Sequence, residues 1–503
     1  MSVKNIISVF VIIIFFSACQ KSWDDYYYRE LDETLDFTVW EVLNENPEYS
    51  MFVDFINEHD MDTFFNSKKA LTVFVPLNQA FEEFEYDSGF INTILAYHLI
   101  GNVMNIYNID DSRIIETSTG KFMWLEENNN RYYVDGNEIV YASPLCKDGR
   151  FYVVESVLIP KPTIYEYLSF NSTIFKRFID QQDSIKMDYT KSKPLGFDDE
   201  GNTIYDSVFT IINPFYEEFF PVDEEFRRRR ATIIIFDEEQ YHSALNEMAD
   251  NIGDQFTDYR DIPLDWQYNR LLPFTLRNGM FAGSLGYSDF QKGKLKNIAG
   301  DSVDVDFTMI DPFSRFLCSN GVVFKYENYS VPEELYLSEK RIQGEELITP
   351  LGASVYGWKE NVKVSGSSIS PNISFLKSAD NDSLIALNLG SNYTDDFMLE
   401  FTIPNVFPTR YRLEWRALSR PSGYYEIYIN NENVGEFDLA DLRRVQYSVT
   451  GDIFLPEDGL NSIDFSVENI NKYGDVRVGI KYIDGGLGSS NGFSIDYISL
   501  IPY

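Results

Sequence analysis

Alternating arginines and tyrosines in the last third of the chain could bind a sugar. Two adjoining segments are predicted to be β-strands, in which successive side chains point to opposite faces. Tyrosine rings stack on sugar rings, and guanidinium groups bond hydroxyls and carboxylates. We expect one face to carry four glycan-binding candidates: Arg412, Arg416, Tyr424 and Tyr428. The alternative is a solvated face with cross-strand Arg–Glu pairs.

Two tryptophans lie near these residues in the sequence. Trp415 alternates in phase with Tyr411 and Leu413, so we expect it in the core and not on the candidate surface. Trp358, further upstream, is added as another glycan-binding candidate.

The sequence carries no recognised catalytic or metal-binding motif. Its three histidines, His59, His98 and His242, lie far apart, with no H-E-x-x-H and no C-x-x-C pattern. A G-x-S-x-G motif, a phosphate-binding glycine loop and a dinucleotide fingerprint are also missing from the sequence. We therefore expect no catalytic residues, no cofactor and no metal, and predict that the protein is not an enzyme.

The charge of the chain excludes one class of partner. The formal net charge is −37, and the aromatic content is 16%. Nucleic-acid-binding proteins need a basic surface, so we expect no nucleic acid partner. The aromatic content gives weak support for a binding function.

The N-terminus has the order of a secretory signal: a lysine, an apolar run, then small residues. The apolar run is shorter than the roughly 20 residues that span a bilayer. With Cys19 directly after Ser17 and Ala18, residues 1–18 resemble a bacterial lipoprotein signal. That resemblance implies that Cys19 is acylated, for example with palmitate, and becomes the mature N-terminus. An ordinary signal peptide with an incidental cysteine is the alternative.

Three segments of the chain recur further along it, which indicates two tandem units. Each unit opens with a threonine followed three residues later by Glu, a capping box that predicts a helix start. A β-branched strand and a closing strand follow in both. The pairs are Thr38–Leu43 with Thr163–Leu168, Thr72–Phe81 with Thr232–Tyr241, and Asp148–Pro160 with Asn320–Pro332. The last pairing also superposes Cys146 on Cys318, so we expect two separate buried thiols and no disulfide.

These segments resemble the fasciclin-like domain, whose pattern is a T-V-F-A-P-x-N-x-A-F strand, a Tyr-His pair and a closing strand that ends at proline. The first unit, residues 37–161, carries all three, with Tyr97-His98 as the pair and Asp148 and Tyr152 as mild departures. His98 is expected to be a hydrogen-bonded structural residue. In the second, degenerate unit, residues 162–340, Phe236 replaces the strand proline and Phe274-Thr275 replace Tyr-His.

An insertion at about residues 191–230 interrupts the second unit. It is aromatic and acidic and ends in four arginines. One hypothesis is a partner-binding protrusion. The favoured hypothesis is a loop packed on its own domain, with the arginines pairing with Asp223, Glu224 and Glu225.

From residue 345 to 503 the chain shows short alternating strands divided by Gly, Pro, Ser and Asn turns. In three segments, Arg410–Ser419, Tyr425–Leu439 and Gly492–Pro502, this part resembles the jelly-roll and galactose-binding-like modules that are often attached to glycan-active proteins. The predicted fold class is thus multidomain α+β and all-β: two tandem fasciclin-like α+β domains followed by a β-sandwich. Residues 19–36 are expected to form a polar tether.

Taken together, these resemblances imply a non-catalytic surface lipoprotein of Bacteroidetes type. It would be held in the outer membrane by its N-terminal lipid, facing the exterior, with Asp24 and Asp25 as an export signal. Its expected ligand is a polysaccharide or oligosaccharide. Its expected partners are a TonB-dependent transporter of the starch-utilisation type and the glycan-binding lipoprotein of that transporter. The alternative is an adhesin-like lipoprotein whose fasciclin-like domains bind a protein or host matrix partner.

Overall fold

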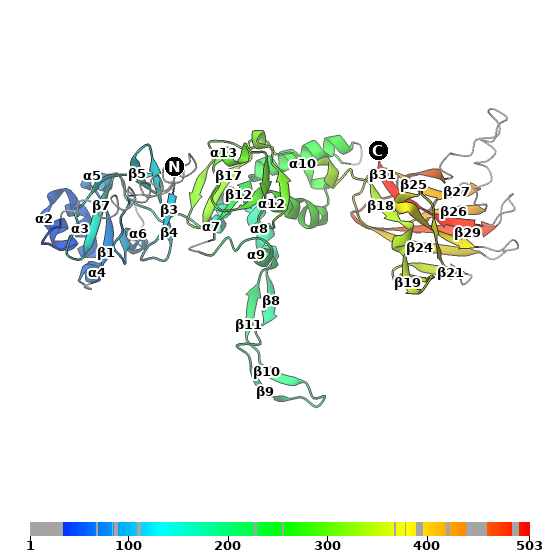
Figure 1. The fold of residues 1–503 in the computed structure, drawn as a ribbon, viewed down its shortest axis with the longest axis horizontal. Coiled ribbons are helices and arrows are strands. Elements are labelled where there is room, and N and C mark those ends of the chain that lie inside the picture. The colour runs from blue at the N-terminus through cyan, green and yellow to red at the C-terminus, as the bar shows by residue number, and fades with distance from the viewer. Residues whose placement is uncertain are drawn as a thin grey trace, which may run out of the picture. The chain divides into compact units, whose positions relative to one another are not determined.

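The structure, a computed structural model, is shown in Figure 1. It describes residues 34–66, 69–82, 84, 89–107, 112–225, 229–253, 256–366, 369–377, 379–388, 396–418, 423–438, 460–484 and 492–503. The chain divides into two compact units, Met1–Ile235 with Gly279–Lys325 and Phe236–Asn278 with Tyr326–Tyr503. Cys19 lies outside the described residues. In the described ranges, no helix has both the length and the apolar character needed to cross a membrane.

A seven-stranded sheet organises the first part of the first unit, in the order β2-β1-β7-β6-β5-β4-β3. Its strands are β1 (Leu71–Pro76), β2 (Leu99–Ile100), β3 (Ser112–Glu116), β4 (Phe122–Asn128), β5 (Arg131–Val134), β6 (Asn137–Ala142) and β7 (Gly149–Val154). β1 and β7 run parallel and are buried at every residue. Since side chains alternate along a strand, Val73 and Val75 join one core while Phe74 joins a second. The helices are α2 (Val39–Glu45), α3 (Ser50–Glu58), α4 (Asp62–Phe65), α5 (Asn78–Glu82) and α6 (Ile91–Tyr97).

A four-stranded sheet in the same unit repeats the central strand pairing, in the order β13-β12-β17-β16. Its strands are β12 (Ala231–Ile235), β13 (Met280–Ala282), β16 (Phe316–Cys318) and β17 (Gly321–Lys325). β12 and β17 are parallel, as β1 and β7 are. The remaining elements are α7 (Ile164–Asn171), α8 (Thr173–Gln181), α9 (Pro214–Glu218), α13 (Tyr287–Phe290) and the hairpin of β14 (Lys294–Lys296) and β15 (Ser302–Asp304).

The predicted helix starts are confirmed, and they connect to the predicted closing strands. Thr38 and Thr163 each form a complete capping box. The first helical amide then donates to the side chain before the closing strand: Val39 N–H to Asp148 Oδ1 at 2.8 Å, and Ile164 N–H to Asn320 Oδ1 at 2.8 Å. A carboxylate and an amide oxygen thus accept the same bond, which is why Asp148 is a mild departure.

The favoured prediction that the insertion packs on its own domain is wrong for its first part, up to residue 212, whereas in its second part Phe215, Phe220 and Val222 are buried. The insertion begins earlier than expected, with β8 (Ser184–Met187), and continues through β9 (Lys193–Phe197), β10 (Thr203–Asp206) and β11 (Phe209–Ile212) as two antiparallel hairpins. Figure 1 shows these strands projecting from α9. The guanidinium group of Arg230 lies 5.0 Å from the centre of the Phe122 ring. Burial lowers the pKa of Arg230 to about 10, opposed by the charge of Glu225, which is one of its predicted acidic partners. Arginines 227 and 228 lie outside the described residues.

The second unit contains the helices α10 (Glu238–Ile252), α11 (Leu264–Trp266) and α12 (Leu272–Gly279), and a β-sandwich. One sheet has the order β18-β31-β25-β28 and the other β21-β24-β29-β26-β27. Their strands are β18 (Lys340–Gln343), β31 (Tyr497–Pro502), β25 (Tyr411–Leu418), β28 (Leu460–Val467), β21 (Lys363–Gly366), β24 (Phe397–Val406), β29 (Gly474–Asp484), β26 (Tyr424–Ile429) and β27 (Glu432–Asp438). Three further strands, β22 (Asn372–Phe375), β23 (Ser383–Asn388) and β30 (Gly492–Ile495), form a third sheet, and β19 (Ile348–Gly352) and β20 (Val355–Trp358) form a hairpin.

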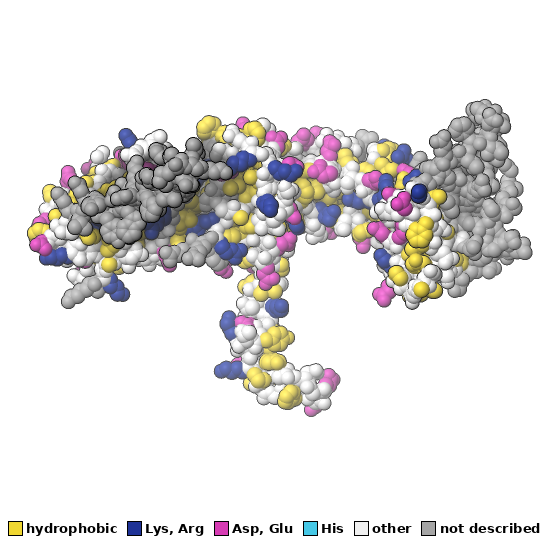
Figure 2. Space-filling view, in the orientation of Figure 1, with side chains coloured by type: hydrophobic (Ala, Val, Ile, Leu, Met, Phe, Trp, Pro, Cys, Tyr) yellow, Lys and Arg dark blue, Asp and Glu magenta, His cyan; other side chains and the backbone are white. Residues whose placement is uncertain are grey.

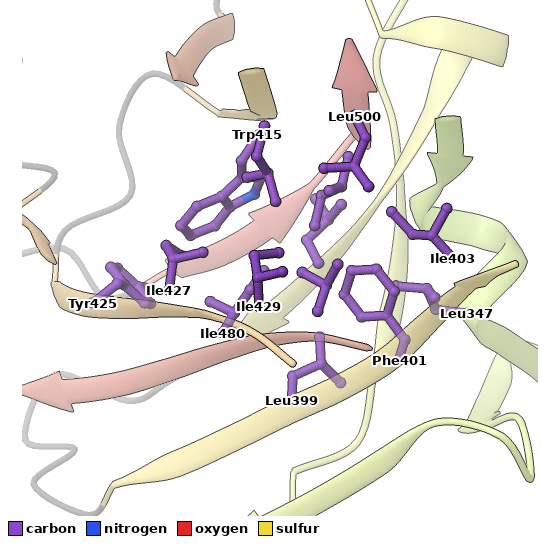
Figure 3. Close-up of a cluster of buried hydrophobic side chains, with 14 of the residues drawn as sticks. Leu347, Leu399, Phe401, Ile403, Trp415, Tyr425, Ile427, Ile429, Ile480 and Leu500 are labelled. Carbon is purple, nitrogen blue, oxygen red and sulfur yellow. The ribbon is translucent and has the colours of Figure 1, made fainter. Parts of the chain in front are cut away.

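The sandwich core is built from the inner faces of both large sheets. Trp415 is fully buried, lies 5.3 Å from the ring of Tyr425 and donates from Nε1 to the carbonyl of Ser494 at 3.0 Å. Figure 3 shows Trp415, Tyr425 and Phe401 in one cluster of apolar side chains. The prediction that Trp415 belongs to the core is confirmed.

The prediction of one face bearing both arginines and tyrosines is wrong. β25, which carries Arg412 and Arg416, belongs to the four-stranded sheet, whereas β26, which carries Tyr424 and Tyr428, belongs to the five-stranded sheet. The residue alternation was correct, but the chain changes sheet between the two strands. Because the inner faces of the sheets meet in the core, the outward side chains of β25 and β26 lie on opposite surfaces of the sandwich.

Candidate functional site

The outer face of the five-stranded sheet carries the tyrosine pair. Along β26, Tyr425, Ile427 and Ile429 are fully buried, and Tyr424 and Tyr428 alternate with them and are partly exposed. We name the outward residues here, together with their neighbours on β24, β27 and β29, the tyrosine face. Its described members are Tyr424, Glu426, Tyr428, Glu436, Lys481, Met398 and Glu400.

Hydrogen bonds fix the side chains of the tyrosine face. The Tyr428 hydroxyl donates to Glu426 Oε2 at 2.7 Å, and Lys481 Nζ donates to the same oxygen at 3.1 Å. The bond from Tyr428, then that from Lys481, lowers the pKa of Glu426, so its carboxylate is charged at neutral pH. The Tyr424 hydroxyl donates to a carboxylate oxygen of Glu436. Each ring is therefore anchored at its hydroxyl end.

A glycine under the tyrosine face brings two side chains together. Gly479 on β29 stands opposite Tyr428 on one side and Glu400 on the other. A Cβ at position 479 would lie 2.5 Å from Met398 Cε and 3.2 Å from Tyr428 Cβ. Glycine at this position thus allows the methionine methyl and the tyrosine to approach each other across the strand.

The tyrosine face has the chemistry needed to hold a sugar chain. Two rings four residues apart on one strand are separated by about 13 Å, which suits two different sugar rings of one chain. Carboxylates accept hydrogen bonds from hydroxyls, and the lysine ammonium donates to hydroxyl or ring oxygens. The site therefore offers stacking surfaces with acceptors and a donor beside them.

The two arginine candidates lie on the other sheet, and one has a structural role. Arg416 Nη1 is 3.2 Å from Asp496 Oδ2, whose residue is fully buried. Burial raises the pKa of Asp496 to about 6, opposed by the charge of Arg416. The aromatic ring of Tyr497 lies under Arg416 at 5.7 Å and under Arg341 at 3.9 Å. Arg412 is exposed on the same sheet.

Trp358, at the end of β20, is partly buried against the sandwich core. Its Nε1 donates to the carbonyl of Ile369 at 2.9 Å. The indole nitrogen is therefore engaged within the sandwich. Glycan binding by Trp358 stays a prediction, as it does for the tyrosines and arginines.

The Tyr-His pair of the first unit is buried and hydrogen-bonded. Tyr97 and His98 are both 0% exposed. The Tyr97 hydroxyl donates to Asp135 Oδ2 at 2.7 Å. His98 bonds the Phe74 carbonyl through Nδ1 at 2.8 Å and accepts from the Leu158 N–H through Nε2 at 3.0 Å. The expectation of a structural histidine is confirmed.

Comparison with known families identifies the segment that contains this pair. Residues 47–160 match the Fasciclin domain. Human periostin is 25% identical over 146 residues, which cover 27% of this chain and 18% of periostin. The chain therefore spans less than a fifth of the length of that relative.

Solved structures give two further likenesses. A FAS1 domain pair of the insect cell adhesion molecule Fasciclin I covers 58% of this chain and 99% of its own, with 13% identity and a TM-score of 0.22. A family 35 carbohydrate binding module from Clostridium thermocellum covers 33% of this chain and 99% of its own, with 10% identity and a TM-score of 0.20.

The threonine that opens the central strand of the Fasciclin domain closes a loop, and its equivalent in the second repeat does the same. Thr72 Oγ1 donates to the Asn102 carbonyl and accepts from the Met104 N–H, both at 2.8 Å. Thr232 Oγ1 does the same with Gly283 and Leu285, also at 2.8 Å. The two threonines that correspond in the sequence repeat, Thr72 and Thr232, therefore make equivalent hydrogen bonds.

Sequence reasoning missed the part of the tyrosine face contributed by other strands. Lys481 and Met398 alternate with buried residues of β29 and β24, so their outward direction could be predicted from the sequence. Which strands flank β26 was not readable from any local pattern. Over the residues that the structure describes, no group of three or more His, Cys, Asp or Glu side chains is arranged to hold a metal ion.

Proposed function

We propose that this protein is a non-catalytic lipoprotein that binds a polysaccharide through the tyrosine face of its C-terminal sandwich. The observation that carries the proposal is the Tyr428–Glu426–Lys481 network beside the anchored ring of Tyr424. Preset rings and charges lower the entropy cost of ordering side chains on binding.

The membrane anchor and the cellular role belong to the same proposal. Acylation at Cys19 would hold the chain in the outer membrane, facing the exterior, in a bacterium of Bacteroidetes type. A TonB-dependent transporter and its glycan-binding lipoprotein are the proposed partners. The signal-like residues 1–18 and the small residues before Cys19 support this part.

The buried Tyr97-His98 pair bears on the adhesion alternative. Both side chains are 0% exposed and use their polar atoms inside the domain. A protein partner cannot contact them without unfolding the segment. An adhesive role of the Fasciclin domain would therefore need a different surface, and a spacer role suits the geometry better.

Affinity electrophoresis tests the glycan proposal. The chain from Lys21 to Tyr503 is run in gels that contain neutral and acidic polysaccharides. We expect at least one of them to retard the chain. Tyr424→Ala and Tyr428→Ala should each reduce the binding free energy by roughly 1 to 3 kcal/mol, as for truncated aromatic residues in other binding sites, and should therefore reduce the retardation. Tyr503→Ala is the matched control, because Tyr503 is 64% exposed beyond β31, in the other sheet. Equal retardation of all variants would refute the assignment.

Labelling of growing cells with a palmitate analogue tests the anchor. We expect label on the full chain and its loss in Cys19→Ser, while Cys146→Ser keeps it. Unlabelled wild-type chain would refute lipidation. Purification from membranes under mild detergent should recover the transporter with the wild type. Its consistent absence would remove the uptake role and leave sugar binding intact.

A further inference from the structure

A lysine and a tryptophan of the first fasciclin-like repeat bind to the surface of the second. Trp124 Nε1 donates to the Cys318 carbonyl at 2.9 Å, and Lys121 Nζ donates to Glu166 Oε2 at 2.9 Å. The Arg230 guanidinium group lies 5.7 Å from the centre of the Trp124 ring, which is 1% exposed. We call these contacts the junction. In them, the glutamate of a helix capping box binds a lysine from another segment, and a backbone carbonyl beside it binds an indole.

The first repeat has a corresponding surface, and there it lines a pocket of about 820 Å³. The paired segments of the sequence repeat identify the residues that correspond. They are Glu41 for Glu166, Cys146 for Cys318, and Ala70 for Arg230. All three residues of the first repeat line the pocket. The repeat therefore indicates that this pocket, like its counterpart in the junction, binds a peptide segment.

The pocket offers an aromatic wall and charges of both signs. The rings of Trp40 and Phe65, which both line it, are 4.5 Å apart. Glu41 is exposed, and the backbone bond of its capping box, then the side-chain bond, lowers its pKa, so it is charged at neutral pH. Lys69 and Lys147 are exposed and line the same pocket. A matching segment would carry a cation, an aromatic ring and anions.

The polar tether has side chains of these types within five residues. In chain order they are Lys21, Trp23, Asp24 and Asp25, outside the described residues. In an extended chain the lysine and the tryptophan point to the same side, and they have the chemistry of the pair in the junction. The net charge of −37 repels an acidic segment from much of the protein, but Figure 2 shows basic side chains among the acidic ones. The two lysines of the pocket offer such a place to the aspartates.

The described chain enters the first repeat at the edge of the pocket. Thr34 pairs with Leu145, which lines the pocket, and the Leu35 N–H donates to the Leu145 carbonyl at 2.8 Å. Trp23 precedes Thr34 by eleven residues, a segment that spans at most about 40 Å and can fold back. A short flexible linker gives an effective concentration on the order of millimolar. Even a contact with a millimolar dissociation constant would then be formed about half of the time.

We propose that the tether segment Lys21–Asp25 binds back into the pocket of the first repeat. Trp23 packs on the aromatic wall, Lys21 pairs with Glu41, and the two aspartates approach the two lysines of the pocket. The tether is then a docked segment that fixes how the first repeat is held, and not a free linker. With Cys19 acylated, as proposed above, docking keeps this repeat close to the membrane surface.

Photocrosslinking of the chain from Lys21 to Tyr503 tests the proposal. Val103 lines the pocket and is 43% exposed, so a benzophenone residue is placed at position 103. We expect an intramolecular crosslink to the peptide that contains Trp23, identified by mass spectrometry. The same residue at position 313 is the control, because Phe313 is 94% exposed in the second repeat. Absence of the tether peptide from the position 103 products overturns the proposal. An adduct of twice the chain mass also overturns it, since the tether of a second copy is then bound.

Variants of the tether test the role of the tryptophan. Trp23→Ala should lower the yield of the crosslink at least about threefold, as for loss of a central aromatic contact. Tyr28→Ala is the matched control, because it removes a ring of the same tether outside the docking segment. Equal yields from the wild type and both variants would overturn the assignment of Trp23.

Charge reversal tests the orientation of the segment. Asp24→Lys with Asp25→Lys should lower the yield, and so should Lys69→Glu with Lys147→Glu. All four changes together should restore it, because tether and pocket then exchange signs. Failure of the fourfold variant to recover, with each variant folded by circular dichroism, overturns the orientation.

The full chain in cells tests the contact beside a membrane. Tryptophan also favours membrane interfaces, which compete with the pocket for Trp23. We expect the crosslink from position 103 to the tether to persist in the full chain. Its loss in cells, with the crosslink retained in the purified chain, overturns the proposal for the anchored protein.

Discussion

His98 Nε2 accepts a hydrogen bond of 3.0 Å from the backbone N–H of Leu158. Its Nδ1 lies 2.8 Å from the Phe74 carbonyl, which can only accept. Both bonds are satisfied by a neutral ring protonated at Nδ1. Burial lowers the pKa of His98 to about 4, from the ordinary 6.5. The ring therefore joins β1 to the chain after β7 only while it is uncharged.

We predict an acid-sensitive contribution from His98 to the stability of the Fasciclin domain. Its folded pKa is below the unfolded one, so the stabilisation is complete above pH 6.5 and falls as the pH drops toward 4. The loss amounts to about 3 kcal/mol. Hydrogen exchange of peptides from β1 and β7 should show this loss where the opposing contribution of Asp135, described next, has been removed by Asp135→Asn. His98→Gln can keep both bonds without titrating, and an unchanged pH slope in this variant would contradict the prediction.

We predict that Asp135 contributes to stability with a pH dependence opposite to that of His98. Its carboxylate accepts from the Tyr97 hydroxyl at 2.7 Å and the Trp124 N–H at 2.8 Å, yet burial raises its pKa to about 6 from 3.8. A raised carboxyl pKa costs stability above pH 6, and the cost disappears as the pH falls toward 3.8, by about 3 kcal/mol.

The wild type should therefore show a nearly flat response between pH 6.5 and 4, since the two contributions have opposite signs. Asp135→Asn removes one of them. We expect this variant to lose stability on acidification with the slope of His98 alone, measured by the same hydrogen exchange. A variant as flat as the wild type would show that the Asp135 carboxyl group does not titrate as described.

Gly149→Ala should prevent folding of the Fasciclin domain. A Cβ there would lie 1.8 Å from the Leu71 carbonyl oxygen on the parallel neighbour, and backbone atoms of buried strands cannot retreat. We expect destabilisation above about 4 kcal/mol, seen as insoluble expression or a lost thermal transition. Gly101→Ala is the control, since nothing lies within 4 Å of its Cβ position. Equal stability of the two variants would contradict the described strand contact.

The two internal thiols should resist alkylation in the folded chain. Cys146 and Cys318 are free and buried, which confirms the prediction of unpaired thiols. Burial raises the pKa of Cys146 to about 11 and that of Cys318 further. The thiolate is the nucleophile, so iodoacetamide at pH 8 should add nothing to the chain from Lys21 to Tyr503 until denaturant is present. Mass spectrometry counts the adducts, and labelling of native protein would contradict the assignment.

Local signals made the repeat readable from the sequence. A threonine and a glutamate three residues apart specify a cap within a single turn, and Thr38 and Thr163 fold as that pattern demands. The positions of Cys146 and Cys318 followed from repeat spacing alone. The Fasciclin match at residues 47–160 supports the resemblance for the first unit.

The sequence does not show to which sheet a strand belongs, and the site prediction failed for this reason. Alternation fixes which way Arg412 and Tyr428 point relative to their own strands, but the pairing partners of β25 and β26 are distant in sequence. The prediction for the hairpin part of the insertion, up to residue 212, failed for a similar reason. Alternation in β8 and β11 predicts one buried face, and no pattern tells that the described chain leaves that face uncovered.

Arg416 is predicted to act on stability and not on sugar binding. Arg416→Met would leave the buried carboxylate of Asp496 without its ion pair, at a cost of about 3 to 5 kcal/mol at neutral pH. The pKa of Asp496, already raised to about 6, should rise further, so the penalty should shrink as the pH falls and the group protonates. Combining the change with Asp496→Asn should recover much of the loss. Thermal unfolding of the single and double variants measures the coupling, and retardation on polysaccharide gels should be unchanged throughout. A variant that loses polysaccharide binding but keeps full stability would instead indicate that Arg416 takes part in binding the ligand.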